Sequence, residues 1–288
     1  MIQRSRLFMF AVTLLMSIIT AIAQKQVTDY VDPFIGTTNF SVCHPGAVTP
    51  HGLMSVVPFN VMGSDLNQFD KDSRWWSAPY EHNNSYLTGF AHVTLSGVGC
   101  PEMGTLLLMP TTGDLDVDYH NYGTAYSEEA ASPGYYAVKL DKYDILCEVS
   151  ATTRTSAERY TFPKGRANIL LNLGEGLTNE TGAMVKRVSE TEIEGHRLLG
   201  TFCYNSQAVF PIYFVMRVNK TPKGSGCWKK QPAMKGVEAQ WDKDNGRYKL
   251  YTRYGRELSG NDIGYFMEFD CEEGEQIEVQ MGVSFTSI

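Results

Sequence analysis

The chain has 288 residues and a formal net charge of −7, and 43% of its residues are hydrophobic. Lys and Arg form no long cluster. Phosphate binding needs a basic surface, so this composition excludes a typical nucleic-acid-binding protein. The length suffices for one large domain or two small ones with a sizeable core.

The first 23 residues have the three parts of a secretory signal peptide. Arg4 and Arg6 form a basic start, an apolar run extends from Leu7 to about Ile22, and Ala21-Ile22-Ala23 supplies a small-x-small cleavage pattern. The run is short for a membrane span, which needs about 20 apolar residues. We therefore expect cleavage after Ala23, export to the periplasm or the medium, and no membrane contact afterwards. An uncleaved N-terminal anchor is the alternative.

Six cysteines follow the expected cleavage point. An even number permits disulfides in an oxidising compartment, but the wide spacing does not choose among the possible pairings. No C-x-x-C pair occurs, so no zinc motif is present. Several of these side chains can equally be buried thiols that pack as small hydrophobic groups. The six are Cys43, Cys100, Cys147, Cys203, Cys227 and Cys271.

Residues 24–288 read as strands and loops almost throughout. Apolar residues alternate with polar or small ones from Gln276 to Phe285, and again from Arg247 to Thr252, which is typical of half-buried strands. Asn245-Gly246 accepts the positive φ values of a tight turn and predicts a hairpin with residues 236–241. Further strands are predicted at 135–140, 145–153, 157–162, 167–173, 183–188, 197–204, 210–218 and 263–269.

The spacing of these strands indicates the fold class. Pro163-Lys164-Gly165 predicts a turn between two of them, and Glu192 to Gly195 is interpreted as the turn that leads into another. Many short strands at close spacing favour an all-β fold of two packed antiparallel sheets, a supersandwich-like β-sandwich. Residues 27–113 are richer in Gly, Pro, His, Asn and aromatics, and we expect them to form a layer of ordered loops over the sandwich.

Three clusters in the N-terminal third combine aromatic rings, hydroxyls, carboxylates, imidazoles and glycines. Sugars stack on aromatic rings and need donors and acceptors held in fixed directions, and such clusters can supply both. The alternative is a set of tightly turned structural loops in which the same side chains fill the core. The clusters are Asp32–Thr37 with Pro45–Gly52, Trp75–His82, and Gly89–Gly104.

These clusters resemble the N-terminal domain of glycoside hydrolase family 92, the calcium-dependent exo-acting α-mannosidases. Tyr30 to Thr37 matches the family's YVDPFIGT, Pro45 to Gly52 is similar to PGAxxPFG, and Gly89 to Cys100 is similar to GFSHTHLSGTGC. In the second of these segments His51 stands where Phe is usual, and Leu53 follows where Met is usual. Three further departures affect the sugar or linkage expected rather than the fold. The departures are Thr94 for the second His, Glu102 after Pro101 for the Asp, and Gly104-Thr105-Leu106 for GDI.

The resemblance implies a two-part enzyme, with a β-sandwich followed by an (α/α)₆ barrel that carries the acid, the base and the calcium ligands. The reaction inverts the anomeric centre, which requires two carboxyl groups roughly 6.5–9.5 Å apart. We expect residues 24–288 to be the sandwich alone, with the barrel absent, no catalytic residue and no metal site in this chain, and calcium in the missing domain. A mannose-containing glycan and the barrel are the expected partners.

The resemblance also implies that an aromatic residue of this domain contacts the leaving-group sugar, and Trp75 or Trp76 fits that role best. The two clusters around Trp75–His82 and His92–Glu102 hold the candidates for substrate binding, although His92 is better interpreted as a hydrogen-bonded interior residue. The candidates are Trp75, Trp76, Tyr80, Glu81, His82, His92, Ser96 and Glu102.

Other titratable residues support weaker interpretations. Glu81, Glu102 and Glu175 are the carboxylates to test first for acid–base work, but none lies in a recognisable carboxylate pair. Asp114, Asp116 and Asp118 alternate like a calcium loop, yet they lack its central Gly and distant Glu, which favours a solvated face. The spacing of His44, His51 and His82 matches no zinc pattern.

Three functions remain open from the sequence. The chain is the N-terminal part of an exported α-mannosidase and inactive alone, or a free-standing carbohydrate-binding module, or a docking domain that needs a barrel partner. A docking domain should expose an apolar patch when it is alone.

Overall fold

The computed structural model describes residues 25–39, 42–71, 76–97, 99–177, 182–200, 207–231, 247–252 and 256–288. The chain divides into two units, Met1–Asp32 and Pro33–Ile288. The described part of the first holds a short 3₁₀ helix, η1 (Val27–Tyr30), in which the Asp29 carboxylate accepts a hydrogen bond from the backbone N–H of Gln26 at 2.9 Å.

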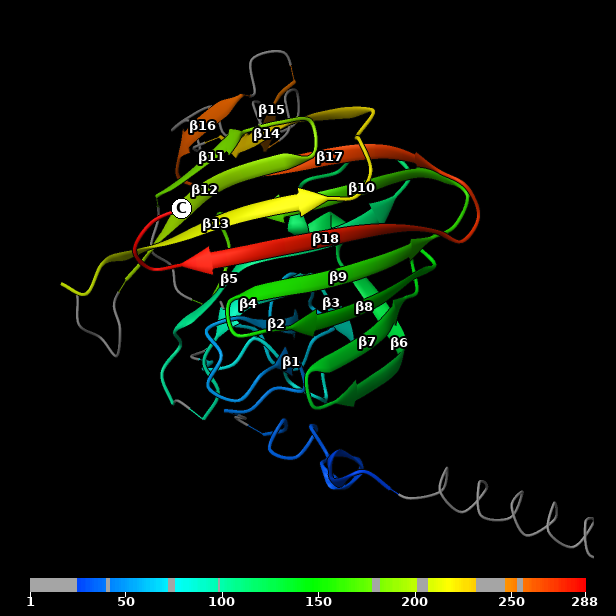
Figure 1. Cartoon of the computed structure of the whole chain (residues 1–288), viewed down its shortest axis with the longest axis vertical. Helices are drawn as coiled ribbons and strands as arrows, with labels where there is room; N and C mark the ends of the chain where they lie inside the picture. The colour runs from blue at the N-terminus through cyan, green and yellow to red at the C-terminus, as the bar shows by residue number, and fades with distance from the viewer. Residues whose placement is uncertain are drawn as a thin grey trace, which may run out of the picture. The chain divides into compact units, whose positions relative to one another are not determined.

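The second unit contains two antiparallel sheets that pack as a sandwich, and Figure 1 shows the larger one face on. The small sheet has the order β1-β2-β4-β5-β10-β17-β14-β15. Its strands are β1 (Ala47–Val48), β2 (Ser55–Phe59), β4 (Gly89–Thr94), β5 (Met103–Thr112), β10 (Gly165–Asn172), β17 (Ile263–Cys271), β14 (Gly224–Lys230) and β15 (Tyr248–Tyr251).

The large sheet has the order β16-β11-β12-β13-β18-β9-β8-β7-β6-β3. The short helix α2 (Tyr119–Tyr122) precedes β6. In the described part of the chain, no helix has the length and apolar character to cross a membrane. The strands are β16 (Glu257–Gly260), β11 (Ala183–Arg187), β12 (Glu192–Leu199), β13 (Phe210–Val218), β18 (Glu275–Ser284), β9 (Thr155–Phe162), β8 (Ile145–Ala151), β7 (Tyr135–Leu140), β6 (Thr124–Ser132) and β3 (Tyr86–Leu87).

The predicted all-β sandwich is confirmed, and most of the predicted strands are present. Strands β7 and β13 have the predicted bounds, and in β8, β9 and β18 buried and accessible residues alternate, so one face of the large sheet forms the core. Strand β15 occupies the predicted 247–252 segment, whereas the hairpin turn at Asn245-Gly246 and residues 236–241 lie outside the described residues.

Two sequence expectations need correction. Residues 27–113 hold loops, but they also supply β1 to β5, four of which belong to the small sheet. Strand β5 is buried along nine of its ten residues, so it has no alternation to detect. Glu192 to Gly195 does not form a turn but begins β12. An added Cβ at Gly195 would lie 2.1 Å from the Met184 carbonyl oxygen and 2.8 Å from the Phe214 ring, so this strand position has no room for a side chain.

The cysteines contribute to the core as thiols. No disulfide joins two of the described cysteines. Cys147 on β8 is fully buried, and this burial raises the pKa of its thiol well above the ordinary value. The prediction that some of these residues pack as small hydrophobic groups is therefore confirmed for Cys147, while Cys203 lies outside the described residues.

One buried polar pair links the two sheets. His92 on β4 and Glu158 on β9 are both 0% exposed in their side chains, and their Nε2 and Oε1 atoms lie 2.7 Å apart. His92 Nδ1 lies 2.7 Å from the carbonyl oxygen of Leu106, which can only accept, so Nδ1 carries a hydrogen. The Glu158 carboxylate also accepts from Tyr160 Oη at 2.5 Å and from Ser156 Oγ at 3.2 Å.

A second cross-sheet link comes from Arg197 on β12, which is 1% exposed. Its guanidinium donates to Thr105 Oγ1 on β5 at 2.5 Å and to the carbonyl oxygens of Gly174 and Glu175. Burial lowers the pKa of Arg197 to about 10, which leaves it charged at neutral pH. The two links fix the relative position of the sheets, because hydrogen bonds to buried polar groups are directional.

We expect His92→Ala to lower the free energy of unfolding by about 3–5 kcal/mol, because it leaves the Glu158 carboxyl group buried without its imidazole partner. Urea unfolding followed by tryptophan fluorescence measures the change. Lys186→Ala, which removes an exposed cross-strand ion pair with Glu194, is the control and should change stability by less than about 1 kcal/mol. Equal losses in the two variants would contradict a special role for the buried pair.

Candidate functional site

The loop from residue 76 to residue 84 holds four of the predicted site residues and is built around buried asparagines. Asn60 follows β2, donates through Nδ2 to the carbonyl oxygen of Glu81 at 2.9 Å, and accepts from the Glu81 N–H at 2.8 Å. Asn84 Nδ2 donates to the carbonyl oxygens of Asn60 and Phe69, both at 2.7 Å. These asparagines satisfy backbone groups that no sheet pairing reaches, and they give the loop a defined shape.

The first motif lies between the other two. The N–H of His82 donates to the carbonyl oxygen of Thr37 at 2.9 Å, and the N–H of Gly97 donates to that of Val42 at 2.6 Å. Gly36 lies in the turn Phe34–Thr37, which the Thr37 N–H closes on the Phe34 carbonyl oxygen at 3.3 Å, and its φ of +79° favours glycine. Thr37 and Val42 thus contact the loop of Tyr80–His82 and the loop that carries Ser96, respectively.

Tyr80, His82 and Glu129 form a hydrogen-bonded chain at this loop. The buried Tyr80 hydroxyl donates to Glu129 Oε2 at 3.1 Å and lies 3.1 Å from His82 Nδ1. Because its one proton goes to Glu129, it accepts from His82, so the hydrogen sits on Nδ1, and in the neutral imidazole Nε2 then keeps its lone pair. Tyr136 Oη donates to the other Glu129 oxygen at 2.6 Å.

The protonation of this chain follows from its surroundings. Burial, and next the Glu129 carboxylate, raise the pKa of Tyr80 well above its usual range, so the hydroxyl stays a donor. The His82 ring is exposed and its centroid lies 5.5 Å from that of Phe34, edge to face. The arrangement presents an imidazole acceptor of fixed tautomer beside an aromatic ring.

Glu81 lies next to this chain but is buried. Its Oε1 accepts from Asn83 Nδ2 at 2.8 Å and from the N–H of Asn39 at 3.4 Å, whereas its buried Oε2 has no hydrogen-bond partner among the residues that the structure describes. The Glu81 carboxylate thus supports the loop through Oε1, and its buried Oε2 can accept a further hydrogen bond.

The remaining predicted site residues lie in different surroundings. Trp76 is 2% exposed, and its ring centroid lies 4.7 Å from that of Phe69. Glu102 is buried immediately before β5, and His92 is the interior residue of the cross-sheet pair. Ser96 is exposed on the loop after β4. Trp75 lies outside the described residues.

The other carboxylates do not form a metal site. Among the described residues, no group of three or more His, Cys, Asp or Glu side chains is placed to hold a metal ion. Asp118 accepts from the N–H of His120 at 3.1 Å and caps α2, while Asp114 pairs with Arg166. Calcium takes six to eight oxygen ligands, so these residues do not fit a calcium site.

Three residues of the site have no sequence signal of their own. Asn60, Asn84 and Glu129 are single polar residues in segments without a motif, and their partners lie 7 to 66 positions away along the chain. Only the concentration of Asn and aromatic residues in the N-terminal third hinted at such a network.

The geometry agrees with what comparison with known proteins shows. The family model described as "Glycosyl hydrolase family 92 N-terminal domain" matches residues 30–284. The chain belongs to this family. The structure of the family GH92 α-mannosidase BT3965 from Bacteroides thetaiotaomicron superimposes with a TM-score of 0.74 and 25% identity, over 91% of this chain and 34% of that one.

Two further relatives extend the comparison. The family GH92 inverting mannosidase BT2199 from the same organism shares the fold, with a TM-score of 0.67 and 18% identity over 92% of this chain and 32% of that one. An uncharacterized secreted glycosidase of Arthroderma benhamiae is 29% identical over 164 residues, which is 54% of this chain and 20% of the relative. The chain thus spans about a fifth to a third of these proteins and is a domain related to glycosidases.

The buried His44, which immediately precedes the family segment Pro45–Gly52, should make stability depend on pH. Burial lowers its pKa to about 4, below the value of 6.5 in an unfolded chain. Between these two values the unfolded state binds more protons, so stability is full above pH 6.5 and falls as the pH drops. We expect a loss of about 2.5 kcal/mol between pH 7 and pH 4.5 from this residue alone.

Urea unfolding of the wild type and His44→Gln at both pH values tests this dependence. The variant lacks a titrating imidazole and should lose less stability on acidification, by about the stated amount. The same pH dependence in both proteins would mean that His44 is not the group responsible.

Proposed function

We propose that this chain is the substrate-contacting N-terminal domain of an exported α-mannosidase, and that it binds part of a mannose-containing glycan. The observation that carries the proposal is the match to a family 92 α-mannosidase over 91% of the chain at 25% identity. The convergence of the three family motifs on one loop layer supports it. The secreted relative and the basic, apolar start of the sequence support export.

The exposed part of the loop layer is the proposed contact surface. His82 offers Nε2 as an acceptor for a sugar hydroxyl, and Phe34 offers an aromatic ring beside it. Trp76 and Tyr80 act indirectly, since both are buried and shape the loop. Trp75 remains a proposed aromatic contact, and Ser96 a proposed hydroxyl contact on the neighbouring loop.

The catalytic steps are assigned to a separate domain. Inverting hydrolysis needs two carboxyl groups that flank the glycosidic bond with room for water. Glu81 and Glu102 are 0% and 3% exposed, and the Glu175 carboxylate lies 3.6 Å from Lys71 Nζ. These three carboxylates therefore suit structural roles, and we propose that an (α/α)₆ barrel with bound calcium supplies the chemistry.

The purified chain should not hydrolyse α-1,2-mannobiose or aryl α-mannosides, with or without added calcium. Release of mannose measured by a coupled assay checks this expectation. A no-protein sample gives the background. If the wild type releases mannose faster than this background, and Glu81→Gln or Glu102→Gln abolishes the release, the assignment of catalysis to another domain is contradicted.

Replacing the exposed imidazole should weaken sugar binding. We expect His82→Ala to raise the dissociation constant for mannobiose about tenfold, which corresponds to one lost hydrogen bond of about 1.4 kcal/mol. Titration calorimetry at millimolar sugar measures it. His120→Ala is the matched control, since His120 is also exposed but lies on α2. Equal affinities of the two variants would argue against His82 as a contact.

A further inference from the structure

The outer face of the large sheet carries a continuous trough. Three hollows of about 220, 380 and 220 Å³ lie on it, and neighbouring hollows share their walls. The first and second share Ser150, Ala157 and Gln280. The second and third share residues of β9, β13 and β18, namely Thr155, Val215 and Gly282.

Strand register explains why the face is hollow there. Tyr135, Ser150, Ala157, Gln280 and Arg217 are successive cross-strand partners on β7, β8, β9, β18 and β13. The middle of this row has short side chains, whereas its ends have long ones. Four strand spacings of about 4.8 Å make the row about 19 Å long, enough for several sugar rings.

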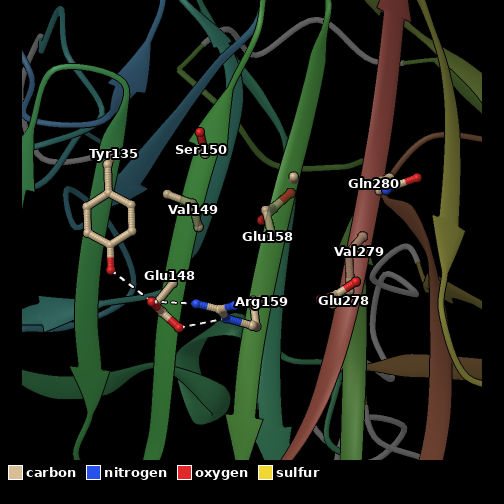
Figure 2. A pocket seen from close by; sticks show the side chains of 10 residues that line it. Tyr135, Glu148, Val149, Ser150, Glu158, Arg159, Glu278, Val279 and Gln280 are labelled. Atoms are coloured by element: carbon tan, nitrogen blue, oxygen red, sulfur yellow. Dashed lines mark hydrogen bonds and ion pairs between the residues drawn. The ribbon is translucent and has the colours of Figure 1, made fainter.

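Polar groups in fixed positions line the first hollow (Figure 2). Arg159 lies between Glu148 and Glu278 in the sheet and pairs with Glu148 through two hydrogen bonds of 2.8 and 2.9 Å. Tyr135 Oη donates to the same carboxylate at 3.0 Å. Two exposed groups on β18 remain available to a ligand. The Glu278 carboxylate can accept hydrogen bonds, and the Gln280 amide can both donate and accept them.

The chemistry of the trough favours a neutral glycan over other ligands. The Arg159–Glu148 pair cancels its own charge, and an acidic chain repels nucleic acid. Ser150, Thr155 and Gln280 place hydroxyl and amide groups in the middle of the trough beside the apolar side chains of Ala157 and Val215, and a sugar uses both kinds of surface. Tyrosine rings stand toward the two ends, Tyr135 in the first hollow and Tyr213 in the third.

We propose that the trough across β7, β8, β9, β18 and β13 is a binding site for an extended, neutral oligosaccharide chain. Planar amide, carboxylate and guanidinium groups hydrogen-bond the hydroxyls, and Tyr135 and Tyr213 contact the ring faces. The trough lies on strands, whereas the residues of the proposed mannosidase function lie on loops, so either assignment can fail without the other.

Filling the floor of the trough tests the proposal. Affinity electrophoresis of the full chain in gels that contain yeast α-mannan or barley β-glucan measures binding. We expect the wild type to be retarded by at least one of them, and Ala157→Trp to weaken that retardation at least tenfold. Ala130→Trp is the matched control, because Ala130 is also an exposed strand residue but lines none of the three hollows.

Gln280→Ala should weaken binding about fivefold and guards against misfolding of the tryptophan variant. Retardation by mannan, glucan or both that falls in Ala157→Trp and Gln280→Ala supports the glycan site and identifies its sugar. No retardation of the wild type, or full retardation of both variants, overturns it. Self-association of the wild type that Ala157→Trp abolishes also overturns it, since the face would then be a protein interface.

Discussion

The structure depends on one buried interaction, the pairing of His92 with Glu158 between the two sheets. Both side chains are removed from water, which costs several kcal/mol per charged group unless every hydrogen-bonding position is used. Leu106, Ser156 and Tyr160 complete those positions. An apolar core of equal volume could be as stable, but it would tolerate sliding of one sheet over the other. The polar pair allows one relative position.

The relative position of the two sheets affects the residues on both faces of β9. Inward residues Ser156, Glu158 and Tyr160 belong to the buried network, and outward residues Ala157 and Arg159 belong to the trough. Because the side-chain period of a strand is two, a register shift of one residue would exchange the two sets. The register of β9 therefore determines both the interior pair and the outer surface. In addition, β4, which carries His92, leads directly into the loop of Ser96.

The sequence predicted most of the strands after residue 130, including β10 and β17, most of whose residues are buried, but not the strands of the N-terminal third. Strands β8, β9 and β18 could be predicted because polar and apolar residues alternate, whereas β5 is buried on both sides and resembles a loop segment with Pro110 in it. The partner of His92 could not be predicted, since Glu158 lies 66 residues away and no local pattern links them. The family motifs located the loop layer, but its supporting residues Asn60 and Glu129 lie outside those motifs.

Aromatic residues in the loop layer show why composition alone leaves sugar binding and structural packing open. Trp76 and Tyr80 are the residue types that stack on sugars, yet both are buried and give their loop its shape. Their burial leaves the shorter His82 exposed and fixes its tautomer through the Tyr80 hydroxyl. Recognition and packing are thus not competing roles within this cluster. The large rings bury enough surface to make the irregular loop backbone rigid. A rigid backbone in turn gives the His82 imidazole a defined direction.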